Sequence, residues 1–290
     1  MTPPLLIAVM GPTAAGKTDL AEQLATDLDA QLINADAFQI YQGMDIGTAK
    51  PERREHYKLL DIRRPDEGFG VGEFVEIAST ILTDLFTDGR NAVVVGGTGL
   101  YIRALFEEYQ DLAPEPDPHL REDLNRLDLA TKVTMLRERD PSSAERIDLR
   151  NPARVQRALE RALAPSTSLC WSLPPYRRLK LALVPDVEET DARIARRVES
   201  MMQNGWVREV TELRERGYRA DHPGFRAIGY RTLLRYLDGE IGREEATATT
   251  IAETRGYAKR QRTWLRSEPN LIELDRDRPL EDARRRLSAL

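Results

Sequence analysis

The sequence predicts an α/β protein in which a parallel sheet is flanked by helices and carries an all-helical insertion. Short apolar runs at residues 5–10, 30–35, 91–95 and 179–184 have the length and composition of buried parallel strands. Segments with helical spacing separate these runs, as in β-α-β units. Residues 119–164 show helical spacing and no strand signal, which indicates the insertion.

The first apolar run leads into a glycine-rich motif, G-x-x-x-x-G-K-T, at residues 11–18. Gly11 and Gly16 permit a tight turn in which backbone N–H groups converge on an anion. Lys17 adds a full positive charge, and the Thr18 hydroxyl is a ligand suited to Mg²⁺. The predicted helix that follows points its positive end at the same place. The motif predicts a bound phosphate or diphosphate, without saying whether phosphate is transferred or leaves.

Two further turns are expected at the edge of the sheet where this loop lies. The second run ends at Asp36, and the third run ends in a glycine turn at residues 96–99. Carboxyl ends of parallel strands face the ligand in such sheets, so Asp36 is expected to point into the site. From position alone, Asp36 is equally well a general base or a helix N-cap or magnesium-shell residue.

The remaining elements follow from spacing and from turn residues. Alternating prolines at 114, 116 and 118 indicate a linker before the insertion. The predicted organisation is a phosphate-loop core at residues 1–112 and 165–290 with a helical insertion domain at 113–164. Within the core we expect a short strand at 59–62, a glycine-rich loop at 68–72, helices at 73–87, 100–105, 188–217 with a break at Gly205, 224–237 and 243–266, and an edge strand at 271–274.

Composition describes a cytoplasmic enzyme. The 290 residues are 41% hydrophobic and 31% charged, no apolar run has the length of a membrane span, and no export signal is recognisable. The only cysteine, Cys170, excludes disulfides within the chain and cysteine zinc sites. A net charge of −5 argues mildly against nucleic acid. We expect a monomer that does not bind membranes.

Local charge patterning argues the other way. Two sets of basic residues recur at i, i+4, i+7 and i+11, so each lies on one face of a helix. A solvated face with carboxylate partners is the usual meaning of such charge. Two such faces in an acidic protein favour a basic cleft for a polyanion. The sets are Arg150, Arg154, Arg157 and Arg161, and Arg255, Lys259, Arg262 and Arg266.

Taken together, several motifs resemble the tRNA dimethylallyltransferases, also called tRNA isopentenyltransferases, of the bacterial type without a zinc finger. They run over nearly the whole chain in the family's order. The matching segments are residues 11–18, 34–36 with 39–41, 43–51, 96–101, 157–160, 226–230 and 258–264.

The resemblance implies a P-loop NTPase-like fold, Mg²⁺ as cofactor, and transfer of a dimethylallyl group from dimethylallyl diphosphate to N6 of the adenine 3′-adjacent to the anticodon. Asp36 matches the general base, with Lys17 and Thr98 also catalytic and Thr18 the metal ligand. The diphosphate would be bound by Gly11, Pro12, Thr13, Ala14, Ala15, Gly16, Lys17, Thr18 and Arg197. The tRNA contacts would fall on Asp36, Ala37, Phe38, Gln39, Thr98, Arg121, Gln156, Arg157, Ala158, Leu159, Glu160, Arg226, Ala227, Ile228, Gly229, Tyr230 and Arg231.

The chain departs from the family pattern at four places. Ala37 stands where the family usually has serine, and Gln42 where it usually has arginine. A His-His pair is replaced by Tyr57-Lys58, and a Tyr-Ser pair by Phe69-Gly70. These departures leave the reaction class intact and bear on a tRNA contact at Ala37 and on the rate.

Other functions fit part of the sequence. A small-molecule kinase also uses a phosphate loop, an aspartate after the second strand and an arginine-bearing lid. Such a kinase needs neither the turn at Thr98 nor a second long basic face beginning at Arg255. An isopentenyltransferase acting on free adenine nucleotides would need neither the insertion nor the C-terminal basic helix. A nucleotide-dependent binding module without catalysis is disfavoured by the many polar motifs expected at one cleft.

Overall fold

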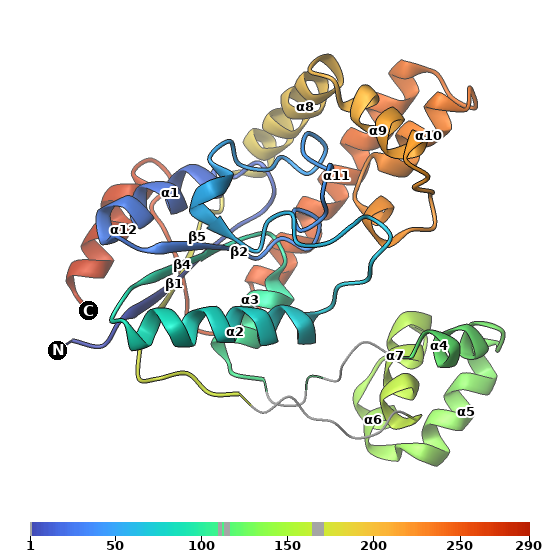
Figure 1. Ribbon diagram of the computed structural model, residues 1–290, viewed down its shortest axis with the longest axis horizontal. Helices are drawn as coiled ribbons and strands as arrows, with labels where there is room; N and C mark the ends of the chain where they lie inside the picture. Colours follow the sequence, from blue (N-terminus) through green and yellow to red (C-terminus); the bar gives the residue numbers. More distant parts are fainter. Residues whose placement is uncertain (1, 110–111, 113–116, 164–170) are drawn as a thin grey trace. The chain divides into compact units, whose positions relative to one another are not determined.

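The computed structural model describes residues 2–109, 112, 117–163 and 171–290 (Figure 1). These residues form two compact units. The first comprises Met1–Phe69, Ile77–Glu108 and Ser172–Leu290, and the second Gly70–Glu76 and Tyr109–Trp171. Cys170 and the prolines at 114 and 116 lie outside the described residues.

A single parallel sheet forms the centre of the first unit, which confirms the predicted fold class. Its strand order is β3-β2-β4-β1-β5-β6, and every neighbouring pair runs parallel. All six residues of the central strand are buried, as expected for a strand covered on both faces. The strands are β1 (Leu5–Met10), β2 (Gln31–Asn34), β3 (Tyr57–Lys58), β4 (Ala92–Val95), β5 (Arg177–Ala182) and β6 (Leu271–Glu273).

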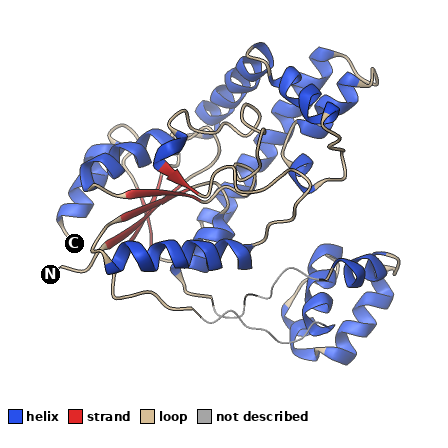
Figure 2. Cartoon of the chain, viewed as in Figure 1, coloured by secondary structure: helices blue, strands red, loops and turns tan. Residues whose placement is uncertain are grey.

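Helices cover the sheet on both sides (Figure 2). Leucine and alanine side chains of α1 (Lys17–Leu28) pack on the sheet together with Ala283 of α12 (Pro279–Ser288). Figure 1 shows α2 (Val71–Thr87) and α3 (Gly99–Phe106) on the opposite side of the sheet.

A second apolar core lies beside the carboxyl ends of the strands. It is built around Trp206, Phe225 and Tyr230, each at most 1% exposed. Gly205, with φ of 103°, separates the first two helices of this core, as its position in the sequence predicted. The helices are α8 (Val187–Gln203), α9 (Trp206–Glu215), α10 (Tyr230–Leu237) and α11 (Arg243–Leu265), with a 3₁₀ turn at Pro223–Arg226.

The second unit is helical, with a core of its own that includes Leu124, Leu136, Val155 and Leu159. Three of its helices begin at an aspartate whose carboxylate accepts a backbone N–H of the first turn, which satisfies a donor that the helix cannot. These helices are α4 (Pro118–Asn125), α5 (Leu129–Arg139) and α6 (Pro141–Arg146). The fourth helix is α7 (Pro152–Leu163).

Four sequence-based expectations about elements were wrong. The helix expected at 224–237 is a 3₁₀ turn at Pro223–Arg226 followed by α10, which begins only at Tyr230, because Ala227 is extended and Gly229 has a positive φ. The short strand lies at Tyr57–Lys58 rather than 59–62, because Leu59 and Asp61 adopt positive φ angles that a strand cannot contain. The glycine-rich loop ends at residue 70, since α2 begins at Val71. The C-terminal helix, α12, was not predicted, although Pro279 stands at its first position, where proline favours a helix start.

Candidate active site

The phosphate loop joins β1 to α1 as the motif requires. Gly11 has φ of 152°, and a Cβ atom there would lie 2.5 Å from the carbonyl oxygen of Leu183, so only glycine fits. Gly16, with φ of 88°, turns the chain into the helix. The ammonium group of Lys17 donates to the carbonyl oxygen of Pro12 at 2.8 Å and thus folds back over the loop. The two glycines and this hydrogen bond together define the conformation of the loop.

Asp36 follows β2 and is held by the backbone around it. Its Oδ1 accepts the N–H of Phe38 at 3.0 Å. The buried side chain of Asn34 accepts the N–H of Asp36 at 3.1 Å and donates to the carbonyl of Leu59 at 2.9 Å, which fixes the turn. Asp36 is thus positioned by hydrogen bonds with Asn34 and Phe38, and Leu59 holds Asn34 in turn.

Asp36 and Lys17 influence each other's ionisation. Burial raises the pKa of Asp36, while backbone donors and the charge of Lys17 oppose that rise. Burial lowers the pKa of Lys17 to about 8; Asp36 opposes this, and the nearby charge of Arg197 adds to it. Groups with shifted pKa values that share one site are typical of acid–base and anion-binding chemistry.

The third turn, after β4, brings Thr98 against the Asp36 segment. The Thr98 hydroxyl accepts the N–H of Ala37 at 3.0 Å, and the Thr98 N–H donates to the carbonyl of Ala35 at 3.2 Å. A Cβ atom built on Gly97 would lie 3.3 Å from Oδ2 of Asp36 and 3.4 Å from the hydroxyl oxygen of Tyr257. The Asp36 carboxylate and the Tyr257 hydroxyl therefore both face this glycine.

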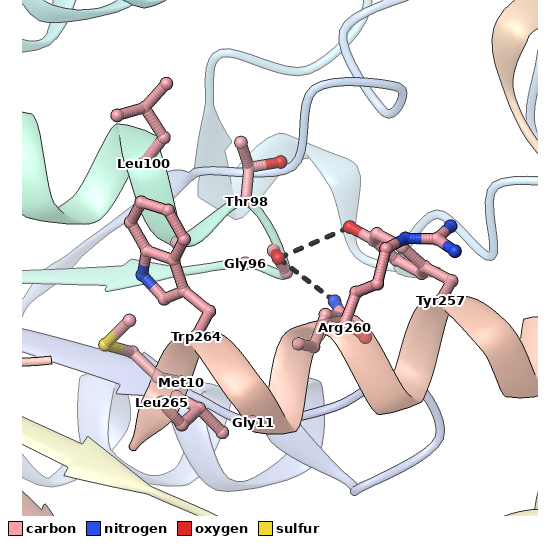
Figure 3. Close-up of a pocket in the computed structure, with 12 residues that line it drawn as sticks. Met10, Gly11, Gly96, Thr98, Leu100, Tyr257, Arg260, Trp264 and Leu265 are labelled. Carbon is pink, nitrogen blue, oxygen red and sulfur yellow. Dashed lines mark hydrogen bonds between the residues drawn. The ribbon is translucent and has the colours of Figure 1, made fainter. Parts of the chain in front are cut away.

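Helix α11 closes the site with residues to which the sequence reasoning gave no role. Tyr257 and Gln261 both donate to the carbonyl of Gly97, at 3.3 and 3.0 Å (Figure 3). They border a mainly apolar pocket of about 210 Å³, where Thr98 and Trp264 are also seen in Figure 3. Gln261 belongs to a recognised motif, residues 258–264, but its partners could be identified only from the fold.

A larger cavity, of about 340 Å³, brings together predicted residues from four distant segments. Asp36 and Thr13 meet Arg197 of α8 and the segment Arg226–Ile228 there. Apolar side chains supply much of the remaining wall, including Phe38, Ile194, Val198 and Met201. The cavity therefore combines positive charge, a carboxylate and an apolar surface.

The structure places other predicted residues elsewhere. Tyr230 is fully buried, and its hydroxyl donates to Glu209 at 2.6 Å. Gly229 also lies in the interior, and the guanidinium of Arg231 donates to the carbonyl of Ala220 at 2.8 Å. A tRNA contact at these three positions stays a prediction. Gln39 donates to the carbonyls of Thr48 and Ala49, which steadies the loop that lines the cavity.

The polar predicted residues of the second unit form one network, in which Gln156 also donates to Glu160 at 3.4 Å. Glu160, 1% exposed, accepts two hydrogen bonds from Arg121, at 3.0 and 3.2 Å, and one from Arg157 at 3.3 Å. Gln156 accepts from Lys132 and donates to Asn125. Burial alone would raise the pKa of Glu160, but the bonds and charge of Arg121 leave it lowered. Ala158 is half-buried and Leu159 lies in the core.

The two basic faces differ in character. Arg150 lies before the start of α7 and pairs with Asp148, so it does not belong to a helical face as predicted. On α7 itself, Arg154 is exposed. On α11, Arg262 is largely used within the protein, because it donates to the carbonyls of Pro185 and Asp186 and to the Thr190 hydroxyl. Arg255 is paired with Asp191 at 3.5 Å. The interpretation of α11 as a continuous phosphate-binding face is therefore weakened at these positions.

We searched the described residues for clusters of metal ligands and for membrane-spanning helices. No three His, Cys, Asp or Glu side chains there lie close enough to hold a metal ion. No helix in that part of the chain is long and apolar enough to cross a membrane.

Comparison with known proteins identifies a consistent group of relatives. The family model described as IPP transferase matches residues 39–268, and that described as isopentenyl transferase matches residues 4–64. A tRNA dimethylallyltransferase of Prochlorococcus marinus (strain MIT 9313) is 39% identical over 97% of this chain and 95% of its own length. The solved structure of the full-length tRNA isopentenylpyrophosphate transferase of Bacillus halodurans is 34% identical, with a TM-score of 0.72 and coverage of 98% of this chain and 95% of that one. A tRNA delta(2)-isopentenylpyrophosphate transferase of Staphylococcus epidermidis is 30% identical, with a TM-score of 0.69 and coverage of 99% and 98%.

Proposed function

Because the chain belongs to the tRNA dimethylallyltransferase family, we propose that it transfers a dimethylallyl group from dimethylallyl diphosphate to N6 of the adenine 3′-adjacent to the anticodon of tRNA, with release of diphosphate. One observation carries the proposal: Asp36, Thr13 of the phosphate loop and Arg197 border one cavity whose surface is mostly apolar. A diphosphate ester with a short hydrocarbon tail, next to a base that accepts a proton, fits that combination.

The donor half of the reaction needs stabilisation of a departing diphosphate. As the allylic C–O bond breaks, negative charge grows on the diphosphate oxygens. The loop amides, the Lys17 ammonium and the Arg197 guanidinium are positive groups at the place where that charge develops. The apolar wall formed by Ile194, Val198 and Met201 suits the five-carbon tail.

The acceptor half needs removal of a proton from a weak nucleophile. The N6 lone pair of adenine is delocalised into the ring, and the amino group becomes acidic only as the new C–N bond forms. The carboxylate form of Asp36, held by the N–H of Phe38, would accept that proton. Thr98 would act through position, since its hydroxyl holds Ala37 in the same turn. The adenine must leave its stack to reach this cavity, which a single-stranded loop permits.

The donor set at the loop fits Mg²⁺. Thr18 stands at the first turn of α1, and its hydroxyl makes no hydrogen bond within the part of the chain that the structure describes. Mg²⁺ commonly binds through one protein oxygen together with substrate phosphate oxygens, so no carboxylate cluster is required. Bound there, Mg²⁺ would neutralise charge on the leaving diphosphate.

The same proposal includes the helical insertion at 113–164 as a tRNA-contacting domain and a monomeric, cytoplasmic enzyme. A kinase reading of the phosphate loop is not favoured, since the family relatives are named as transferases acting on tRNA.

The test is transfer of labelled dimethylallyl from its diphosphate to an anticodon stem-loop that contains the adenine, with Mg²⁺ present. We expect label in the RNA, N6-modified adenosine by nucleoside mass analysis, and release of diphosphate. A stem-loop with guanine at that position is the matched control and should remain unlabelled. Consumption of ATP with phosphorylation of a small acceptor, and no label in RNA, would overturn the proposal.

A further inference from the structure

Gln261 reaches from α11 to the phosphate loop. Its Oε1 accepts the N–H of Thr13 at 2.7 Å, and its Nε2 donates to the carbonyl of Gly97 at 3.0 Å. The side chain is 7% exposed. Both ends of the amide are used, and turning it over would set donor against donor and acceptor against acceptor. The orientation with Oε1 toward Thr13 is therefore fixed.

The neighbouring backbone is shaped around this contact. A Cβ atom on Gly97 would lie 2.4 Å from Nε2 of Gln261, so any other residue there would displace the glutamine. Tyr257, one turn earlier on α11, donates to the same Gly97 carbonyl at 3.3 Å, and Figure 3 draws both bonds. The Gly97 turn thus has two anchors on α11, whereas only Gln261 also reaches the loop amide.

The contact changes what the loop can offer an anion. The N–H groups of Ala14, Gly16, Lys17 and Thr18 make no hydrogen bond within the described residues and are open to a ligand. The N–H of Thr13 is different, because Gln261 already occupies it. An anion approaching Thr13 would also meet the lone pairs of Oε1. One amide of the loop is therefore withheld from phosphate.

The position of Thr13 indicates which phosphate group of a bound ligand would lack a hydrogen-bond donor. Thr13 borders the cavity that holds Asp36, whereas Lys17 and Thr18 begin the helix. Under the proposed function, on which this inference rests, the carbon to be transferred must lie on the Asp36 side of the diphosphate. A diphosphate ester then has its hydrocarbon near Thr13 and needs no donor there. A triphosphate in the same seat would put its terminal phosphate against Oε1.

We propose that Gln261 is a specificity-determining residue: by occupying the Thr13 N–H, it makes the loop favour diphosphates over triphosphates. The cellular competitors it excludes are nucleoside triphosphates, which share the phosphate chain and Mg²⁺ but carry one phosphate more.

Calorimetric titration of the whole chain with inorganic pyrophosphate and inorganic triphosphate, each with Mg²⁺, tests the proposal. The wild-type protein should bind pyrophosphate more tightly. In Gln261→Met the ratio of the two dissociation constants should move toward triphosphate by about fivefold to tenfold, the effect of freeing one hydrogen-bond donor. Gln203→Met, an exposed glutamine on α8, is the matched control and should leave the ratio unchanged. An unchanged ratio in Gln261→Met overturns the proposal.

Two more variants separate the loop contact from the turn contact. Gln261→Glu keeps an acceptor for the Thr13 N–H and loses the donor to Gly97. Its ratio of dissociation constants should therefore not move toward triphosphate, although the added negative charge weakens the binding of both anions. Tyr257→Phe leaves Thr13 covered and should also keep the ratio. A shift toward triphosphate in either variant would mean that the Gly97 turn determines the selectivity. It would refute the proposal that Gln261 acts by occupying the Thr13 N–H. Gln261→Leu serves if the methionine variant does not fold, as judged by its melting curve. These titrations need no RNA, so a chain that binds as expected yet does not prenylate would refute only the proposed function.

Discussion

At the scale of single residues, the site depends on two groups whose ordinary chemistry is changed by burial. The motif predicts that Lys17 and Asp36 meet at one edge of the sheet, because both follow carboxyl ends of strands. Their altered pKa values could not be predicted from the sequence, since desolvation depends on how completely distant segments enclose them. The structure shows that both groups are enclosed, so the pH dependence of activity can test their roles.

The pH profile of kcat/KM for dimethylallyl diphosphate should have two limbs set by these residues. Activity needs Asp36 ionised, so it should rise with pH through a pKa above the ordinary carboxyl value. Activity also needs Lys17 charged, so it should fall as pH rises through about 8. In Lys17→Arg the charge no longer titrates in this range, and the upper limb should move to higher pH. If the upper limb stays near pH 8 in Lys17→Arg, then the titration of Lys17 does not cause it.

Replacement of Asp36 tests the base directly. Asp36→Asn should lower kcat by about 10²–10⁴-fold, because the amide cannot accept the N6 proton, while tRNA binding changes little. Single-turnover transfer and filter binding measure the two quantities separately. Asp27→Asn, an exposed aspartate paired with Arg284 on the surface, is the matched control. Near-normal turnover of Asp36→Asn would show that Asp36 is not the general base.

Residues outside the recognised roles were harder to predict. Tyr257 lies outside every recognised motif, and Gln261 belongs to the motif at 258–264 without a predicted role. Their importance comes from Gly97, which lies more than 150 residues earlier and offers both of them one carbonyl. No local signal specifies a partner at such a distance, although the glycine itself marks a close approach of backbone and neighbour.

At the scale of elements, apolar periodicity predicted most helices and strands. It did not predict backbone conformation or the burial of polar side chains. The strand at β3 was misplaced because the positive φ angles of Leu59 and Asp61 leave no hydrophobic signature. The strand β5 holds a buried lysine, Lys180, that an apolar strand would not be expected to contain. Its charge is balanced by Glu268 at 2.7 Å and Glu107 at 2.6 Å.

Glu268 is the centre of that ionic cluster and should matter for stability. Its carboxylate, with no exposed surface, also accepts from Arg103 at 2.8 Å and from the Trp264 indole at 3.1 Å. Glu268→Ala leaves buried cations without their partner and should lower the free energy of unfolding by about 3–5 kcal/mol. Urea unfolding followed by circular dichroism measures it.

An exposed ion pair provides the comparison for this variant. Glu240 pairs with Arg235 at 3.0 Å with both side chains more than half exposed. Glu240→Ala should change the free energy of unfolding by about 0–1 kcal/mol. If Glu268→Ala costs no more than Glu240→Ala, the buried cluster does not stabilise the first unit.

At the scale of the whole molecule, the order of the strands explains why motifs far apart in sequence share one site. β2, β4 and β1 are neighbours in the sheet, so the turns that follow them, with Asp36, Thr98 and the phosphate loop, emerge side by side. The sequence predicted the turns and the parallel sheet, and the resemblance predicted the family, which the comparisons confirm. The strand order itself and the enclosure by α11 depend on long-range packing, which periodicity does not encode.

The charge of the helical unit provides the last test, because it asks whether that unit binds RNA at all. Arg154 is exposed on α7, so its charge is open to a phosphate. Arg154→Glu should weaken tRNA binding and reduce the slope of log K against log salt by about one unit for a lost phosphate contact. Affinity for dimethylallyl diphosphate should not change, since the loop and Arg197 belong to the first unit. Arg139→Glu, an exposed arginine on α5 outside the basic face of α7, makes the same change of net charge. Equal effects of the two substitutions on the salt slope would mean that net charge alone acts, and that the α7 face is an ordinary solvated surface.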